Sequence, residues 1–378
     1  MNTIYIADQG NSQIAISWQR GNSPPKYYPP IPFNDPLNAK DHGELRWYLE
    51  EYLQFPYGAE SYRAQKVEEN MAKWGEALFK QAFPTGNTGA NPGIFYQEAV
   101  REGLRGCEFC VSSDNPDFLN IPWELIYDPT PGRGYLAPSL GGLYRQRSGQ
   151  SVEATRDDLS PAPNQPFRIL LVIARPEGAG YIPIGSVARP LLEALRPFRP
   201  KISLEVLRPP TLDALQKRLN DQPGRYQLVH FDGHGVFAKA TGSLPQYGIA
   251  GDSGHLVFEN LDGTPKYVSS QDIGQLLADC RVPLFVLNAC QSAEEGKSDP
   301  FSSVASQLIA VGAKGVIAMA YSVYVSAASK FVQRFYEALV QNKSLSQAVA
   351  DGRRRLYAEP EHESVAGSIS LKDWIVPT

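Results

Sequence analysis

Two long apolar runs in the second half of the chain each end abruptly on small or polar residues. One spans residues 226–235 (YQLVHFDGHG) and the other spans residues 282–292 (VPLFVLNACQS). Continuous apolar runs bounded by turn residues are typical of central strands in a parallel sheet that is covered on both faces. Residues 269–280, between the runs, repeat apolar positions with helical spacing. The pattern predicts a strand, a crossover that contains a helix, and a second strand.

The same alternation continues through residues 167–378. Apolar runs predict strands at 167–174, 202–207, 226–231, 282–287 and 315–320, and periodicity predicts helices at 187–198, 212–219, 269–280, 302–311, 326–341 and 344–356. A short hairpin is expected near residues 256–267, inside the crossover. Strands that alternate with helices predict a three-layer α/β/α sandwich with a mostly parallel sheet.

The N-terminal part of the chain follows a different pattern. Short β-rich runs at residues 3–8 and 13–18 predict a hairpin. Helical periodicity predicts one helix from Asp41 to Pro56 and a longer one over residues 61–83, followed by a strand at 104–111. These elements indicate a smaller α+β lobe.

The length of the chain agrees with two lobes. A chain of 378 residues is longer than one ordinary domain. We expect the α+β lobe over residues 1–144, a polar, proline-containing linker over 145–166, and the α/β lobe over 167–378.

Composition narrows the class of protein. Apolar residues make up 42% and charged residues 20% of the chain, which is typical of a globular protein with an ample core. A formal net charge of −4 gives no support to nucleic-acid binding, which favours a basic face. No apolar stretch approaches the length that spans a bilayer, and the N-terminus lacks a secretory signal pattern. We expect a cytoplasmic protein that binds neither nucleic acid nor membranes.

The four cysteines do not indicate a disulfide framework or a metal site. Cys107 and Cys110 form a C-x-x-C pattern, but on the predicted strand their side chains face opposite sides and cannot share a metal ion. The chain holds no second such pair to complete a zinc site. Cys280 ends an amphipathic helix and is expected in the core. We therefore expect no metal and no cofactor.

We expect reactive side chains at the ends of the two strands that are predicted within residues 226–235 and 282–292. A right-handed crossover lays these strands beside each other with both carboxyl ends at one edge of the sheet. His234 and Cys290 then lie at neighbouring strand ends, where open α/β sheets place their ligands. A thiol beside an imidazole can act as an activated nucleophile.

Three segments resemble the CHAT family of caspase-fold cysteine peptidases, which are relatives of caspases and separase. They are HFDGHG at residues 230–235, LNACQS at 287–292, and the proline-tryptophan-glutamate-leucine segment within residues 121–128. The resemblance covers residues from about 41 to 378, and it is specific because three separate motifs occur in the right order. It implies a caspase-like fold. Glu124 in the third segment is expected to form a structural ion pair rather than to act in catalysis.

The resemblance implies roles for the residues at the strand ends. His234 would act as the general base and Cys290 as the nucleophile, since a free thiol titrates near 8.5 and needs help to ionise at neutral pH. The backbone N–H groups of Gly235 and Cys290 would form the oxyanion hole. Gly233 is expected to let the backbone turn sharply and present His234 outward.

Alternative interpretations exist for three of these residues. His230 competes for the role of base, but it lies inside the predicted strand and is expected to be buried, so we favour His234. Asp232 is either an orienter of the base or an acid in a turn. Cys290 alone would be interpreted as a buried cysteine at a strand end, and the paired histidine and the motifs favour the nucleophile.

The residue before the scissile bond of a substrate is expected to be neutral or apolar. Many caspase-fold relatives bind arginine or lysine there with acids two residues before the cysteine and just past the next strand. This chain has Asn288 at the first place and no acid in residues 321–326. Val323 and Tyr324 are candidate walls of the pocket, and Asp252 and Asp299 are the acids that could restore a basic preference.

The paired residues and the family resemblance together imply a cysteine endopeptidase that cleaves a protein substrate by a His234/Cys290 dyad. The resemblance implies a role in prokaryotic signalling or defence, with regulation by a linked module or a partner protein. The last residues, 373–378, resemble the closing strand of the family, and the chain stops immediately after them, so we expect it to be part of a longer protein. The alternative is a catalytically silent interaction module with the same fold.

Overall fold

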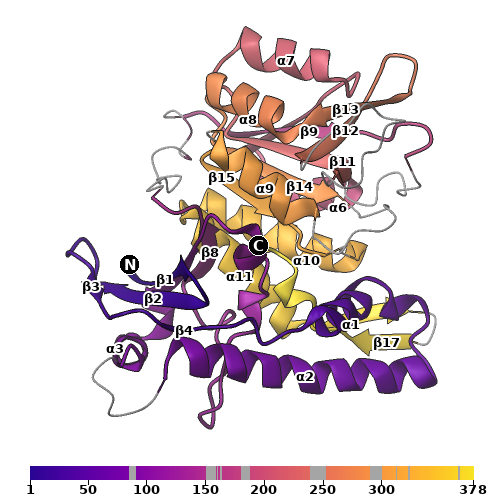
Figure 1. Cartoon of the computed structure of the whole chain (residues 1–378). Helices are drawn as coiled ribbons and strands as arrows, with labels where there is room; N and C mark the ends of the chain where they lie inside the picture. Colours follow the sequence, from indigo (N-terminus) through magenta and orange to yellow (C-terminus); the bar gives the residue numbers. More distant parts are fainter. Residues whose placement is uncertain are drawn as a thin grey trace. The chain divides into compact units, whose positions relative to one another are not determined.

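The computed structural model of the chain describes residues 1–84, 91–149, 164–179, 188–238, 253–289, 300–311, 313–321, 324–364 and 367–378, together with Leu159 and Pro161. Contacts divide the chain into two compact units (Figure 1). The first unit contains residues 1–150, 346–376 and 378, and the second contains residues 151–345 and 377.

The second unit is built on a sheet that has seven strands among the described residues. They are β9 (Phe167–Ile173), β10 (Ile202–Val206), β11 (Leu228–Ala238), β12 (Ser253–Glu259), β13 (Pro265–Ser269), β14 (Leu284–Ala289) and β15 (Gly315–Ala318). Five strands are parallel in the order β10-β9-β11-β14-β15, and β12 and β13 continue from β11 as antiparallel strands.

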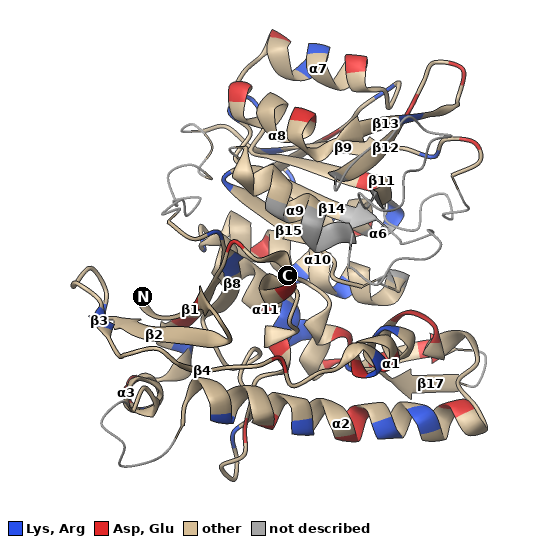
Figure 2. Ribbon diagram, viewed as in Figure 1, with Lys and Arg blue, Asp and Glu red and all other residues tan. Residues whose placement is uncertain are grey.

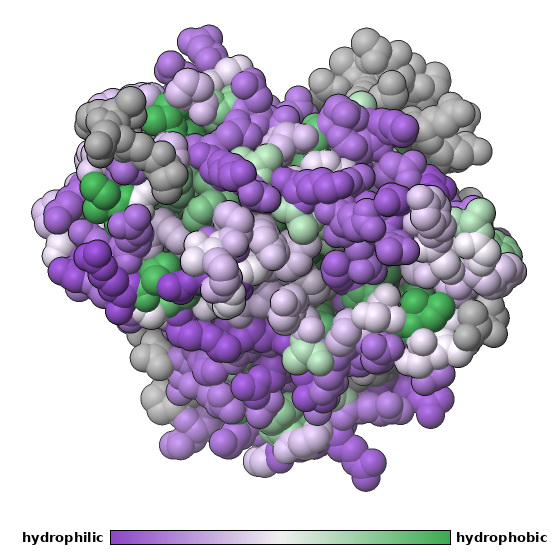
Figure 3. Space-filling view, turned by 90° about the horizontal axis from the view of Figure 1, so that it is seen from below, coloured by the Kyte–Doolittle hydropathy of each residue, from purple (hydrophilic) through white to green (hydrophobic). Residues whose placement is uncertain are grey.

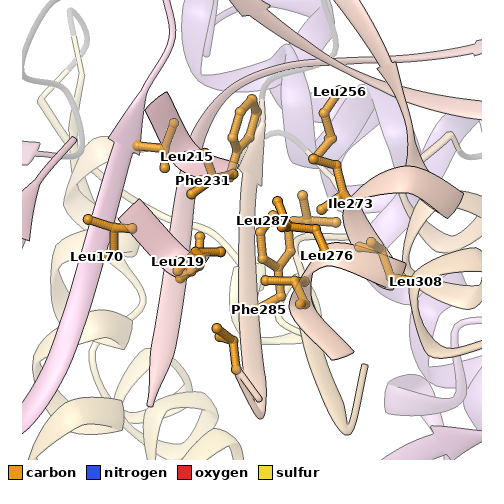
Figure 4. Close-up of a cluster of buried hydrophobic side chains, with 14 of the residues drawn as sticks. Leu170, Leu215, Leu219, Phe231, Leu256, Ile273, Leu276, Phe285, Leu287 and Leu308 are labelled. Atoms are coloured by element: carbon orange, nitrogen blue, oxygen red, sulfur yellow. The ribbon is translucent and has the colours of Figure 1, made fainter. Parts of the chain in front are cut away.

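Helices cover both faces of the parallel strands. They are α6 (Ala188–Leu195), α7 (Leu212–Asp221), α8 (Ser270–Asp279), α9 (Pro300–Ala310) and α10 (Val325–Val340), with a 3-10 turn, η4 (Arg196–Phe198), after α6. Leucines of α7, α8 and α9 pack on Phe231, Phe285 and other strand residues in one buried cluster (Figure 4). On the opposite face, α10 contributes Tyr336 against His230 and packs on α6. This arrangement confirms the predicted three-layer α/β/α sandwich.

β11 is longer than the sequence pattern predicted. The apolar run indicated a strand that ends at Phe231, but the strand continues to Ala238. Its second half pairs with β12, from His234 opposite Val257 to Ala238 opposite Ser253. The prediction was too short because residues 232–235 include residues that are common in turns. In the structure β14 pairs with Asp232 and Gly233, and β12 pairs with His234 and the residues after it, so the strand stays extended.

The first unit is the predicted smaller α+β part. Its main sheet has the order β3-β2-β1-β5-β8, with β4 paired to β2. The strands are β1 (Asn2–Gly10), β2 (Gln13–Gln19), β3 (Lys26–Tyr27), β4 (Ile31–Pro32), β5 (Cys107–Ser112) and β8 (Gly142–Gln146). Two small hairpins add β6 (Tyr127–Asp128) with β7 (Gly134–Tyr135), and β16 (Glu361–Ser364) with β17 (Gly367–Ser370). Cys107 and Cys110 lie on β5, and both are buried.

Five α-helices are described in the first unit: α1 (Ala39–Glu50), α2 (Ala59–Ala82), α3 (Gly93–Glu102), α4 (Pro116–Leu119) and α11 (Leu345–Ala358). Four 3-10 turns accompany them, at Tyr52–Gln54, Leu104–Gly106, Trp123–Leu125 and Asp373–Ile375. The apolar stripe of α2, which includes Val67, Met71 and Leu78, is buried as its periodicity predicts.

The exposed side of α2 carries charges of both signs. Figure 2 shows basic and acidic residues interspersed along this helix, and Lys66 pairs with Glu69 while Lys80 pairs with Glu76. Figure 3 shows one face of the molecule, on which hydrophilic residues predominate and hydrophobic residues form small, separate groups. Among the described residues, no helix has both the length and the apolar content that crossing a membrane requires.

The helix α11 groups with the first unit, although the predicted lobes placed residues 346–376 with the second. Its side chains contact two carboxylates of the first unit. The Ser346 hydroxyl donates to Glu108 on β5 at 2.6 Å, and Arg353 lies 3.4 Å from Glu124 in the Trp123–Leu125 turn. Periodicity predicted the helix correctly, but it carries no information about which buried carboxylates the helix meets.

Candidate active site

His234 is the first residue of β11 beyond the parallel part of the sheet. β11 pairs with β9 up to Asp232 and with β14 up to Gly233, whereas His234 pairs with Val257 of the antiparallel strand β12. His234 therefore lies at the carboxyl edge of the parallel strands, which is where open α/β sheets place their ligand sites.

Gly233 is required for space rather than for a turn. A Cβ atom at this position would lie 2.8 Å from two ring atoms of Phe231, closer than real Cβ contacts come. The strand runs through Gly233 without turning, so the predicted sharp turn was wrong. The glycine lets the ring of Phe231 fold against the backbone just before His234.

His234 and His230 are both buried, at 2% and 0% exposure. Exposure therefore does not distinguish them, although the sequence predicted that it would. Their surroundings do. His230 lies between β9 and β14, with Leu171 and Val286 as its register partners, and its Nδ1 atom is 3.3 Å from the hydroxyl oxygen of Tyr336. Burial lowers the pKa of His230 to about 4, which keeps its imidazole neutral near pH 7. His230 is thus a core histidine inside the parallel sheet.

The expected nucleophile, Cys290, lies outside the described residues. It follows Ala289 directly in the sequence, and Ala289 pairs with Gly233 in the parallel register of β14 and β11. His234 follows Gly233 in the same way. In the sequence, the two expected dyad residues therefore directly follow the two members of one register pair, Gly233 and Ala289.

The other expected site residues have different positions. Gly235 is buried and pairs with Leu256 of β12, the backbone of Asn288 pairs with Asp232, and Tyr324 immediately precedes α10. Asp252, Asp299 and Val323 lie outside the described residues. The roles expected for these residues stay predictions.

Arg175 belongs to this edge of the sheet, although no motif in the sequence indicated it. Its Nη2 atom donates to Oδ2 of Asp232 at 2.7 Å, and the side chains of the pair are 16% and 2% exposed. Burial raises the pKa of Asp232 above its ordinary value, and Arg175 opposes part of this rise. The signal that could have found Arg175 is its place directly after the apolar run 167–174, at a strand end like those of the dyad. The role of Asp232 as an orienter of His234 stays a prediction.

Comparison with known proteins agrees with these features. The family model of the CHAT domain matches residues 94–374, which is most of the chain. The chain belongs to the CHAT domain family. The match confirms the resemblance predicted from the motifs, and it spans the Pro-Trp-Glu-Leu segment, His234 and Cys290.

The solved structures include a more distant likeness to the CHAT chain. The crystal structure of the Arg-specific cysteine proteinase gingipain R is similar to it over 85% of this chain and 71% of that chain, with 13% sequence identity and a TM-score of 0.37. No curated protein matches the chain.

The Pro-Trp-Glu-Leu segment of the CHAT domain holds a buried ion cluster. Glu124 accepts hydrogen bonds from Nη1 and Nη2 of Arg145 at 2.7 and 2.8 Å, and Nη2 of Arg353 on α11 lies 3.4 Å from its Oε1 atom. Burial opposes ionisation, but the two arginines outweigh it and hold the pKa of Glu124 below its ordinary value. These contacts agree with the structural ion pair expected for Glu124.

Proposed function

We propose that this CHAT protein is a cysteine endopeptidase that uses His234 as general base and Cys290 as nucleophile. The thiolate of Cys290 attacks the carbonyl carbon of a scissile peptide bond, and His234 accepts the thiol proton and passes it to the leaving amine. The N–H groups of Gly235 and Cys290 stabilise the oxyanion. Water then hydrolyses the thioester and releases the second product.

The observation that carries this proposal is the register of β11 and β14. Gly233 and Ala289 pair across two neighbouring parallel strands, and His234 and Cys290 follow them in the sequence. Membership of the CHAT family supports the same assignment. We further propose that the substrate is a protein, that the enzyme acts in the cytoplasm in prokaryotic signalling or defence, and that a linked module or partner protein regulates it.

Selective alkylation tests the dyad without knowledge of the substrate. The chain is treated with iodoacetamide, and each of the four cysteines is followed by peptide mass spectrometry. Burial raises the pKa of Cys107 to about 12 and also raises that of Cys280, so these thiols serve as slow internal references. We expect Cys290 to react fastest, and His234→Ala to slow its reaction at least tenfold.

Two comparisons complete the test. The control variant His42→Ala removes a partly exposed histidine of α1, which belongs to the first unit, and should leave the reaction at Cys290 unchanged. Proteomics of cells that carry the parent chain or Cys290→Ala should show cleaved peptides only with the parent. Equal labelling of all cysteines, independent of His234, together with no cleavage would favour a catalytically silent interaction module.

A further inference from the structure

The gap between the ends of β9 and β11 is the switch point of the parallel sheet. Strand order reverses there, because β10 lies on one side of β9 while β11, β14 and β15 continue on the other. Open α/β sheets commonly bind ligands in the crevice at such a point. Arg175 follows β9 after Ala174. Its guanidinium lies at this switch point and forms hydrogen bonds with Asp232 of β11.

Arg175 fixes the backbone of β11 as well as the carboxylate of Asp232. Its Nη1 atom donates to the carbonyl oxygen of Asp232 at 2.7 Å and to that of Ala174 at 2.9 Å. The backbone N–H of Ala174 donates to the same Asp232 carbonyl at 2.9 Å. Two donors therefore fix the orientation of the peptide bond between Asp232 and Gly233, which directly precedes His234.

The same segment also holds the strand that pairs with His234. The backbone N–H of Arg175 donates to Oε1 of Glu259 on β12 at 2.6 Å, and the N–H of Glu177 donates to the carbonyl oxygen of Gly263 at 2.9 Å. Gly263 lies in the turn between β12 and β13. Residues 174–177 thus join both backbones on which the position of His234 depends.

We propose that Arg175 is a positioning residue of the peptidase site, which holds the Asp232–Gly233 peptide and β12 so that His234 keeps a fixed orientation at the carboxyl edge of the sheet. This inference rests on the proposed function. Asp232 then acts as the buried counterion of Arg175. A planar guanidinium suits this place because it donates to a carboxylate and to carbonyl groups at once in a fixed geometry, which a lysine cannot reproduce. Small displacements of a catalytic group are costly, since a 1 Å error can reduce a rate by about a hundredfold.

Deuterium exchange tests the structural half of this inference whether or not the chain is a peptidase. In Arg175→Met, we expect the amides of the peptide that spans residues 228–238 to exchange at least tenfold faster than in the parent. Arg175→Lys should give an intermediate rate. The control Arg168→Met removes an arginine of β9 that pairs with Glu205 instead, and it should change this exchange less than twofold. Unchanged exchange in Arg175→Met, or an equal effect of Arg168→Met, would overturn the inference.

The pH profile of Cys290 alkylation tests the catalytic half. Asp232 and His234 are two positions apart on one strand, so their side chains share a face of the sheet about 7 Å apart. Asp232→Asn leaves the cation of Arg175 uncompensated and should move the midpoint of the profile to lower pH. Arg175→Met leaves the carboxylate uncompensated and should move it to higher pH. These opposite shifts test whether the Arg175–Asp232 pair acts on the thiol through its charges, and shifts in one direction, or none, would show that it does not. Arg175→Lys keeps the charge but not the fixed contacts, so it tests the positioning role: it should leave the midpoint unchanged and slow the plateau rate at least threefold, and an unchanged plateau rate would contradict that role.

The two proposals fail in different ways. If alkylation of Cys290 in the parent chain does not depend on His234, the proposed function fails. The exchange experiment still shows whether Arg175 holds the backbone of residues 228–238 in place. If Arg175→Met does not fold, Asp232→Asn replaces it in the exchange experiment. That variant should then raise exchange at residues 228–238 at least threefold, and unchanged exchange would overturn the inference.

Discussion

The Nδ1 atom of His230 lies 3.3 Å from the hydroxyl oxygen of Tyr336, and both side chains are buried. This contact places a histidine in the middle of the sheet, four residues before the proposed base. Burial lowers its pKa to about 4, whereas the unfolded chain takes up the same proton near its ordinary value of 6.5. The folded protein therefore holds a neutral His230 over a range in which the unfolded chain is protonated.

His230 should make the protein less stable in acid. Between pH 6.5 and 4 the unfolded state binds the extra proton, so the free energy of unfolding falls as the pH is lowered through this window. From pH 7 to pH 5 the loss from this residue is about 2 kcal/mol, at 1.36 kcal/mol per pH unit below 6.5. Urea unfolding of the parent and His230→Gln at both pH values measures it, since glutamine does not titrate.

The partly exposed His42 provides the control for this experiment. His42→Gln removes an imidazole without changing the core. If the parent, His42→Gln and His230→Gln lose the same stability between pH 7 and pH 5, the role of His230 in acid sensitivity is wrong.

Neutralising Glu124 should destabilise the first unit strongly. The carboxylate is 1% exposed and pairs with both Arg145 and Arg353. Glu124→Gln leaves two guanidinium groups without their shared counterion, and breaking a buried ion pair in this way costs about 3–5 kcal/mol. The free energy of unfolding in urea measures the loss. Glu69→Gln, which breaks an exposed pair with Lys66, should leave the unfolding midpoint nearly unchanged, and a similar effect of both variants would refute the prediction.

Two glycines in helices should respond to alanine in opposite directions. A Cβ atom at Gly75 of α2 would lie 2.0 Å from the carbonyl oxygen of Leu125, whereas one at Gly43 of α1 would meet nothing within 4 Å. Gly75→Ala should destabilise by about 1–3 kcal/mol, because it forces α2 away from the Trp123–Leu125 turn. Gly43→Ala should stabilise by about 0.5–1 kcal/mol, because alanine restricts the unfolded chain and favours the helix. Two variants of equal stability would show that this close approach relaxes freely.

The first substrate subsite is predicted to prefer a neutral or apolar residue. Asp232, an acid at this edge of the sheet, already pairs with Arg175. A buried cation without a carboxylate costs several kcal/mol, and each 1.4 kcal/mol is a tenfold change in preference. Cleavage of a peptide library measures the preference. Strong selection for arginine or lysine that is lost in Asp252→Ala or Asp299→Ala would show an acidic pocket instead.

Much of the second unit could be predicted from the sequence because its signals are local. The continuous apolar runs at 167–174 and 282–287 became β9 and β14, since a strand buried on both faces needs apolar residues at every position. The periodicity of residues 269–280 became α8, with Ser269 as its capping residue. The order of these elements determined the parallel sheet and placed His234 at its carboxyl edge.

The tertiary structure alone decided which polar groups meet. The contact of Glu124 with Arg353 joins residues 229 positions apart, and that of Arg175 with Asp232 joins residues 57 positions apart. The alternation of apolar and polar residues predicts which side chains are buried, but the partner of a buried charge depends on strand register and helix docking. For the same reason the sequence determined a strand before His234, while the pairing of β12 decided that the strand continues to Ala238.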